Sequence, residues 1–292
     1  MSETLPEGLS LVSHLNVDDQ SCFIYTSQTL QTSQNFLVDG SFPWSEVVED
    51  VLAGHGLDEP AAEMGRGAIF FLSGGKLPYP IVVRQYRHGG LLRFLSGARF
   101  FSPHRFISEL KLHTQVQRLG IAVPQALGVI VVKPGAKSIF VNGYYVTRRL
   151  QKSVGLAEYL ESVGAANRLQ ISYDIGAGLR KLHEHGIFYT DLHVKNILVG
   201  PQGEICFIDF DKAKQEKAPL PGSRRRANLY RFIRSIEKYC CRGGKLTDRD
   251  RAAFLIAYEL DPKKYEKLFR QLGFGLFWRY CFYRLGWRLN RS

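Results

Sequence analysis

The apolar pattern of the chain changes near residue 150, and this change constrains the fold more than any other feature. Before that point the apolar residues come in short runs, and glycine and proline interrupt them, as at Ser73-Gly74-Gly75 and Lys133-Pro134-Gly135. Such runs predict short strands that pair in a small antiparallel sheet. The predicted strands lie at 68–72, 79–83, 126–132, 138–141 and 144–147.

One helix interrupts this series of predicted strands. Ser102 is a candidate N-cap, Pro103 suits the first helical position, and Gly120 is a stop signal before the next strand. Apolar residues between them recur at helical spacing. The sequence therefore predicts a helix over 103–119, with Phe106, Leu110 and Val116 on its buried face.

After residue 150 the pattern becomes helical. A short helix is predicted over 156–163, and a longer one opens near Asn167 and ends at Gly186. Two short strands at 196–199 and 205–208 follow, joined by a Gly-Pro-Gln-Gly turn, and helices return from residue 225. We therefore expect an α+β fold of two lobes, a β-rich lobe over 1–150 with one helix and a larger helical lobe over 151–292.

Charge is concentrated at one end of the chain. The 292 residues carry a formal charge of +12, and residues 1–222 hold equal numbers of acidic and basic side chains, so the whole excess lies in 223–292. A basic region of this kind suits polyanions, including nucleic acid, anionic lipid head groups and phosphorylated ligands. No CxxC spacing and no long apolar run is present, so we expect a cytoplasmic protein that is free to rest on a membrane surface.

Three polar residues near the predicted hairpin carry the strongest chemical signal. Asn196 follows Asp191 by five residues, and Asp209 comes directly after the second strand of the hairpin. Phosphoryl transfer needs a carboxylate that orients the acceptor hydroxyl and oxygen ligands for Mg²⁺. Asp191 suits the first role, and Asn196 and Asp209 suit metal binding. Each residue taken alone is as well explained by a turn or a strand-end cap.

This segment resembles the catalytic loop and the Asp-Phe-Gly motif of the protein-kinase-like superfamily, with matches at Asp191, Asn196, Asp209 and Phe210. Asp211 replaces the glycine of that motif, and the Asp-x-His-x-x-Asn pattern is closer to small-molecule kinases than to protein kinases. The resemblance implies a two-lobed fold that binds ATP and Mg²⁺ between its lobes.

The superfamily also pairs a basic strand residue with a helix glutamate to hold the nucleotide phosphates. By this resemblance the helix glutamate is Glu109, and Arg84 stands on its strand where lysine is usual. Gly65 and Gly67 would form the turn that covers the phosphates, although a lone Gly-x-Gly is a weak signal. The alternative for Arg84 and Glu109 is a surface ion pair that contributes little stability.

Further stretches resemble the lipopolysaccharide kinase family, in particular kinases of 3-deoxy-D-manno-octulosonic acid (Kdo). They include the residues after Arg84, which read Gln-Tyr-Arg-His-Gly-Gly-Leu, and the Asn228-Leu229-Tyr230-Arg231 segment. Membership would imply transfer of the ATP γ-phosphate to the 4-hydroxyl of the Kdo sugar on lipid A, within lipopolysaccharide inner-core synthesis. The partner would then be a Kdo-lipid A glycolipid at the cytoplasmic face of the inner membrane, and no nucleic acid is expected.

The C-terminal segment 274–292 mixes seven aromatic residues with arginines and contains no acid. Such a helix either packs in the core or lies on a membrane surface. Two other functions stay open at this stage. One is a kinase of another acceptor, such as a lipopolysaccharide heptose, an aminoglycoside-like small molecule or a protein. The other is a non-catalytic basic module that binds membrane or nucleic acid.

Overall fold

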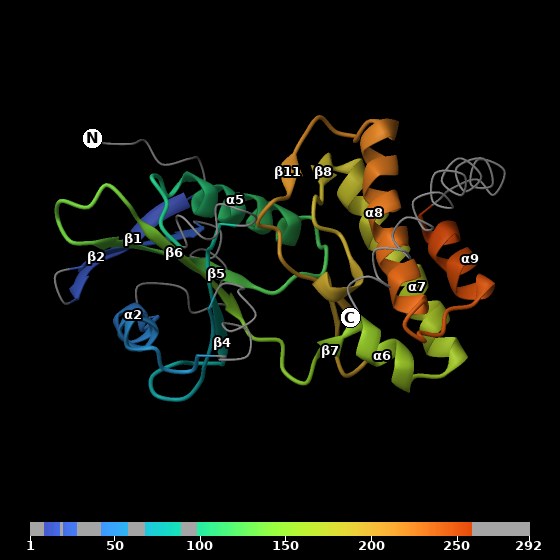
Figure 1. Cartoon of the computed structure of the whole chain (residues 1–292), viewed down its shortest axis with the longest axis horizontal. Helices are drawn as coiled ribbons and strands as arrows, with labels where there is room; N and C mark the ends of the chain where they lie inside the picture. Colours follow the sequence, from blue (N-terminus) through green and yellow to red (C-terminus); the bar gives the residue numbers. More distant parts are fainter. Residues whose placement is uncertain (1–8, 18–19, 28–41, 58–67, 89–97, 259–292) are drawn as a thin grey trace, which may run out of the picture. The chain divides into compact units, whose positions relative to one another are not determined.

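A computed structural model describes residues 9–17, 20–27, 42–57, 68–88 and 98–258 of the chain (Figure 1). The chain divides into two compact units. The first contains residues 1–152 together with 206–214, and the second contains residues 153–205 and 215–292. Among the described residues there are an antiparallel sheet and six α-helices, so the fold is α+β.

The first unit is built on a six-stranded antiparallel sheet with the strand order β1-β2-β5-β6-β4-β3. Pairing of β5 with β6 places Tyr145 opposite Val129, and pairing of β4 with β6 places the same Tyr145 opposite Arg84. The strands are β1 (Leu9–Val17), β2 (Gln20–Ser27), β3 (Ile69–Leu72), β4 (Ile81–Gln85), β5 (Ala126–Pro134) and β6 (Asn142–Arg148).

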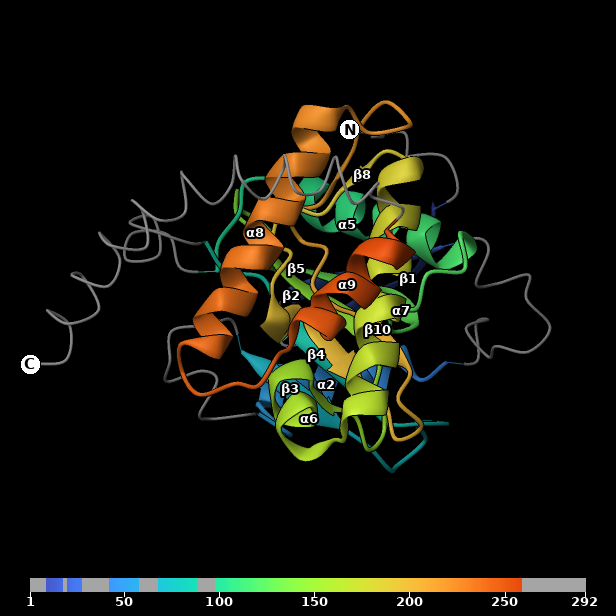
Figure 2. The same cartoon turned by 90° about the vertical axis from the view of Figure 1, so that its right-hand side faces the viewer.

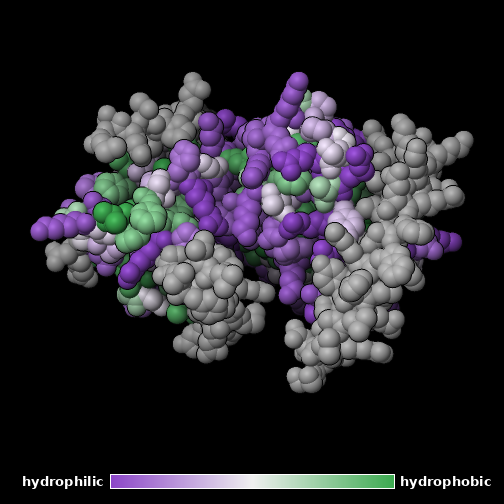
Figure 3. All heavy atoms as spheres, turned by 45° about the horizontal axis from the view of Figure 1, so that its top comes forward, coloured by the Kyte–Doolittle hydropathy of each residue, from purple (hydrophilic) through white to green (hydrophobic). Residues whose placement is uncertain are grey.

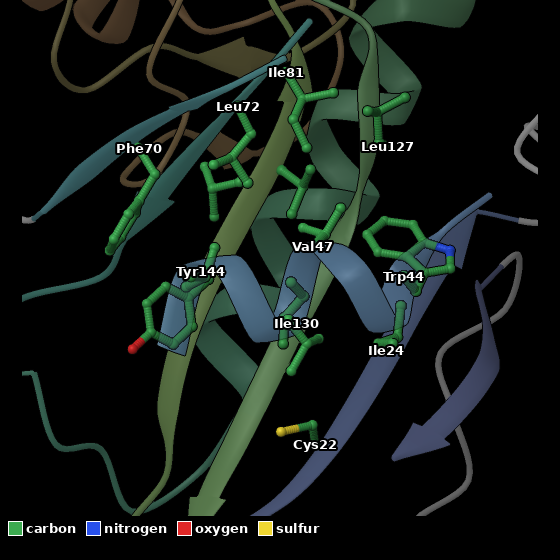
Figure 4. Close-up of a cluster of buried hydrophobic side chains, with 14 of the residues drawn as sticks. Cys22, Ile24, Trp44, Val47, Phe70, Leu72, Ile81, Leu127, Ile130 and Tyr144 are labelled. Carbon is green, nitrogen blue, oxygen red and sulfur yellow. The ribbon is translucent and has the colours of Figure 1, made fainter. Parts of the chain in front are cut away.

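Two helices cover the two faces of this sheet. Helix α2 (Trp44–Ala53) packs on one face, where Trp44 and Val47 belong to one buried cluster with Ile130 of β5, as Figure 4 shows. Helix α5 (His104–Arg118) packs on the other face, where its Phe106 meets Val129. Successive side chains of a strand point to opposite faces, so neighbouring residues of β5 fill both cores. Its first seven residues are all buried.

The predicted helix over 103–119 is confirmed as α5, and its apolar face is buried as expected. The strand predicted at 138–141 is wrong, because that stretch is a connection in which Ile139 is 69% exposed and β6 begins at Asn142. Strands β1 and β2 and helix α2 were not predicted. Pro103 is the N-cap of α5, while Ser102 accepts a hydrogen bond from the backbone N–H of His104 at 3.2 Å.

The second unit is mainly helical (Figure 2). Its predicted helices at 156–163 and from 167 appear as α6 and α7. The chain enters the first unit within β10 and returns within β11. The elements are β7 (Val154–Gly155), α6 (Leu156–Ser162), α7 (Ala165–Glu184), β8 (Ile187–Phe188), a 3-10 turn at Val194–Asn196, β9 (Ile197–Val199), β10 (Ile205–Phe207), β11 (Lys214–Gln215), α8 (Gly222–Cys240) and α9 (Asp248–Ala257).

Helices α7 and α9 approach each other closely at Gly176. A Cβ atom at this position would lie well inside van der Waals contact with the backbone oxygen of Phe254, and 3.1 Å from the Cβ of Ala257. Helix α9 begins at a capping box, in which Thr247 and Asp250 exchange side-chain and backbone hydrogen bonds. The capping box therefore sets the start of α9, and the missing side chain of Gly176 allows α9 to approach α7 closely.

Hydrophilic side chains dominate the described surface on the face drawn in Figure 3. Within the described ranges, none of the helices combines the length and the apolar character that crossing a bilayer requires.

We predict that Gly176→Ala destabilises the protein by about 1–3 kcal/mol, because the added methyl group overpacks the contact between α7 and α9. Helix propensity alone would favour alanine by up to about 1 kcal/mol. Urea unfolding measures the change. The control is Ala166→Gly at an exposed position of α7, which should destabilise by up to about 1 kcal/mol. A Gly176→Ala protein as stable as wild type would contradict the close approach of the two helices.

Candidate active site

Arg84 lies at the centre of a polar network in the first unit. Its guanidinium donates from Nη2 to Oε1 of Glu109 on α5 at 2.7 Å, and from Nη1 to Oδ1 of Asp209 at 2.8 Å. Strand β4 presents Arg84 toward α5, because its neighbours Ile81 and Val83 face the other core. Three residues predicted from sequence, Arg84, Glu109 and Asp209, therefore meet in one place. Glu109 is 3% exposed, so this is not a surface ion pair.

Aromatic residues surround the Arg84–Glu109 pair. The hydroxyl of Tyr86 donates to Oε2 of Glu109, and the rings of Tyr86 and Tyr145 lie 5.4 and 5.9 Å from Cζ of Arg84. Burial raises the pKa of Glu109 to about 7, although Arg84 acts to lower it. Burial acts to lower the pKa of Arg84, yet that pKa lies well above its ordinary value because Glu109 and Asp209 stabilise the cation. The arginine is therefore a permanent positive charge.

The segment after β10 is held in an unusual backbone conformation. Asp209 has φ of 66°, a left-handed value that non-glycine residues adopt at a cost. Three contacts hold the segment: Arg84 binds Asp209, Phe210 is buried with its ring 5.5 Å from that of His113, and Arg105 binds Asp211 through two nitrogens. Asp211, which replaces the glycine usual in this motif, therefore ties the segment to α5.

The second unit holds the other part of the predicted site. The amide nitrogen of Asn196 donates to the backbone oxygen of Asp191 at 2.9 Å, which fixes the loop between them. The carboxylate of Asp191 is 37% exposed. Two basic side chains approach it: Nη1 of Arg231 lies 3.5 Å from Oδ1, and Nε2 of His193 lies 3.8 Å from Oδ2. Asp191 thus presents a partly exposed carboxylate in a fixed loop.

Helix α8 positions this loop through a buried asparagine. Asn228, fully buried, accepts from the backbone N–H of Tyr189 at 3.0 Å and donates to the backbone oxygen of the same residue at 2.9 Å. Two turns further along α8, the hydroxyl of Ser235 accepts from the backbone N–H of Val194 at 2.7 Å. The loop is therefore anchored on α8 on both sides of Asp191.

His183 connects the same asparagine to α7. Its Nε2 lies 3.1 Å from Oδ1 of Asn228, and its Nδ1 lies 2.5 Å from the hydroxyl of Tyr258. Burial lowers the pKa of His183 to about 4. The imidazole is therefore uncharged near neutral pH, with Nε2 donating to Asn228 and Nδ1 accepting from Tyr258. This histidine has a structural role.

Two atoms in these networks suit Mg²⁺. The amide nitrogen of Asn196 is occupied by Asp191, which leaves its amide oxygen for a cation, and Asp209 has a second carboxylate oxygen beside the one that Arg84 binds. Oxygen donors of this kind fit a hard divalent cation. Asn196 belongs to the second unit and Asp209 to the first. No group of three His, Cys, Asp or Glu side chains in the described ranges forms a metal site.

Other predicted features lie outside the described residues. Gly65 and Gly67 fall in the range 58–67, and the aromatic C-terminal segment falls in 259–292. The Gly-Gly-Leu end of the stretch that follows Arg84, residues 89–91, also lies outside.

Sequence reasoning assigned no role to Asn228, Tyr86 or Arg105. Two of these carried a positional signal. Tyr86 stands two residues after Arg84, so both side chains extend to the same face of the sheet. Arg105 precedes Glu109 by one helical turn, which places both on one face of α5. Asn228 lies in the Asn-Leu-Tyr-Arg segment, whose only signal in the sequence is its resemblance to lipopolysaccharide kinases.

We predict that the stability cost of Arg84→Met depends on pH. Because the folded-state pKa of Glu109 is raised from 4.5 to about 7, ionisation of Glu109 costs stability as the pH rises through that range. Arg84 acts to lower this pKa, so the pKa of Glu109 should rise further in Arg84→Met. The loss of stability on ionisation of Glu109 should then continue above pH 7. Urea unfolding at pH 6 and pH 8.5 should therefore show a larger destabilisation by Arg84→Met at the higher pH.

The matched control is the same substitution in a Glu109→Gln background, where no carboxylate is left to ionise. The pH dependence of the Arg84→Met effect should disappear there. An equal effect of Arg84→Met at both pH values in the otherwise wild-type chain would contradict the coupling between the two residues.

Comparison with known proteins gives a consistent family. Residues 57–258 match the model of the lipopolysaccharide kinase (Kdo/WaaP) family. The chain is 29% identical over 211 residues to a 3-deoxy-D-manno-octulosonic acid kinase of Xylella fastidiosa (strain M12), covering 69% of this chain and 79% of that protein. It is 28% identical over 207 residues to a protein of the same name from Vibrio vulnificus (strain YJ016), covering 67% and 80%. The matched range includes both networks around Arg84 and Asp191, and the chain belongs to the lipopolysaccharide kinase (Kdo/WaaP) family.

Proposed function

We propose that this chain transfers the γ-phosphate of ATP to the 4-hydroxyl of the Kdo sugar on lipid A, a step in building the lipopolysaccharide inner core. The chain is a phosphotransferase by family membership. Kdo as the acceptor is supported by the names of the similar proteins from Xylella and Vibrio. The observation that carries the catalytic part is the loop from Asp191 to Asn196, which its own side chains and α8 hold in place.

Asp191 is the proposed catalytic base. Its carboxylate is partly exposed and its backbone oxygen is held by Asn196, so it can accept the proton of an acceptor hydroxyl without a change in the loop. A base positioned in this way contributes about 10²- to 10⁴-fold to rate. Attack of the hydroxyl oxygen on the γ-phosphorus forms the new ester bond and breaks the bond to the leaving phosphate oxygen.

The nucleotide phosphates are assigned to Arg84, which Glu109 orients from α5. A guanidinium presents several N–H donors in one plane, so it can hold Glu109 and a phosphate oxygen together. Asp209 and Asn196 would hold Mg²⁺, which neutralises charge on the transferring phosphoryl group. Gly65 and Gly67 remain the proposed phosphate-covering turn.

In this proposal the first unit is the nucleotide-binding lobe of a protein-kinase-like fold, and the second unit is its catalytic lobe. The division near residue 150 follows the change of apolar pattern, and residues 206–214 carry Asp209 into the first unit. The acceptor is an anionic glycolipid, so we place the protein at the cytoplasmic face of the inner membrane, in peripheral contact with it. The basic excess of residues 223–292 suits an anionic surface.

The direct test offers ATP and Mg²⁺ with five acceptors in parallel: Kdo-lipid A, free Kdo, lipid A without Kdo, a heptose-containing core and a generic protein. We expect phosphate on Kdo-lipid A and none on lipid A without Kdo. Transfer to the heptose core or to protein, with Kdo-lipid A left unmodified, would refute the proposed acceptor.

We predict that Asp191→Asn lowers kcat by about 10²- to 10⁴-fold and leaves the KM for ATP nearly unchanged, because the base is lost while the phosphate contacts remain. Steady-state kinetics with the best acceptor of the panel measures both constants. Asp248→Asn is the matched control, since that side chain is 98% exposed at the start of α9. A folded Asp191→Asn protein with wild-type turnover would rule out the assigned base.

A further inference from the structure

Helix α8 meets the catalytic loop with three side chains of one face. Asn228, Arg231 and Ser235 are spaced at helical intervals and contact Tyr189, Asp191 and Val194 in the same order along the loop. Asn228 and Ser235 bind backbone groups and so hold the loop in position. Arg231 differs, because it contacts the carboxylate of Asp191 and is 52% exposed.

The contact with Asp191 uses little of the binding capacity of Arg231. One nitrogen, Nη1, lies 3.5 Å from Oδ1 of Asp191, at the long end of hydrogen-bond distance. A guanidinium carries five N–H donors arranged for two-pronged binding of a carboxylate. The loop is already fixed by Asn196 and Asn228, so Arg231 is not needed to orient it. The exposed N–H donors of Arg231 are therefore available to bind a ligand.

Two other arginines near the start of α8 are engaged elsewhere. Arg224 binds the carboxylate of Glu216 through two nitrogens at 2.6 and 3.0 Å, and Nε of Arg225 donates to the backbone oxygen of Leu220 at 2.9 Å. Within the part of the chain that is described, the basic side chains that contact Asp191 are Arg231 and His193. Of these two, arginine is charged at every physiological pH.

We propose that Arg231 binds the carboxylate of the acceptor sugar and so selects an acidic sugar at the catalytic base. This inference rests on the proposed function. The reacting hydroxyl must lie within hydrogen-bond reach of Asp191. The carboxylate of Kdo is attached to the same small ring as its 4-hydroxyl, so it lies within a few ångströms of the reacting atom and can reach a cation that itself contacts Asp191. A neutral sugar has no carboxylate that could form a charge-assisted pair with this arginine.

The test compares Kdo-lipid A with the same acceptor after its Kdo carboxyl is converted to the methyl ester, using wild type, Arg231→Gln and Arg231→Lys. For Arg231→Gln we expect the KM for Kdo-lipid A to rise about 10- to 100-fold, as loss of a charge-assisted hydrogen bond predicts, while the KM for ATP is unchanged. The KM of wild type should be higher for the ester than for the acid by a similar factor. For Arg231→Gln the KM values for acid and ester should be equal, because the substitution raises only the KM for the acid. Arg231→Lys should recover part of this loss.

Arg226→Gln is the matched control, because Arg226 is an exposed arginine of the same helix and has no assigned role. It should behave as wild type on both acceptors. The proposal is overturned if Arg231→Gln weakens the acid and the ester equally, or if its main effect is on the KM for ATP. A wild-type enzyme that does not phosphorylate Kdo-lipid A would instead refute the proposed function, and this is seen before any variant is tested.

Discussion

The geometry of the loop from Tyr189 to Asn196 depends on one buried amide, that of Asn228. It pairs with both backbone groups of Tyr189 and also contacts His183, so its donor and its acceptor are both used inside the protein. A buried polar group that loses its partner costs about 1–3 kcal/mol, which makes such an amide strongly selective for one arrangement of its neighbours. The position of Tyr189 then sets where Asp191 can lie, two residues along the chain.

The first unit contains a similar hydrogen-bonded network, which surrounds the positive charge of Arg84. Arg84 is held by two carboxylates and faced by two aromatic rings, and Glu109 is held in turn by Tyr86. Removal of one partner from such a network leaves an uncompensated charge in a poorly solvated place, which is strongly destabilising. Each unit therefore holds its predicted site residues in a hydrogen-bonded polar network of its own.

Much of this arrangement could be predicted from the sequence. Helix α5 has apolar residues at helical spacing between Pro103 and Gly120, so its position could be predicted from the sequence. The pairing of Arg84 with Glu109 was predicted from the resemblance to kinases. Strands β1 and β2 could not be found in the same way, because β1 alternates Leu and Val with Ser, His and Asn and is mostly half-buried. Its stability comes from pairing with β2, a contact that composition does not reveal. The stretch 138–141 has strand-like residues, but it serves as the connection into β6.

Hydrogen–deuterium exchange of residues 189–196 in an Asn228→Ala variant measures whether α8 holds this loop. We expect these amides to exchange about 10- to 100-fold faster than in wild type, as loss of the buried hydrogen bonds requires, while the amides of β5 keep their protection. Ser223→Ala, at an exposed position of the same helix, should leave the loop unchanged. Wild-type protection of residues 189–196 in a folded Asn228→Ala protein would show that Asn228 does not hold the loop.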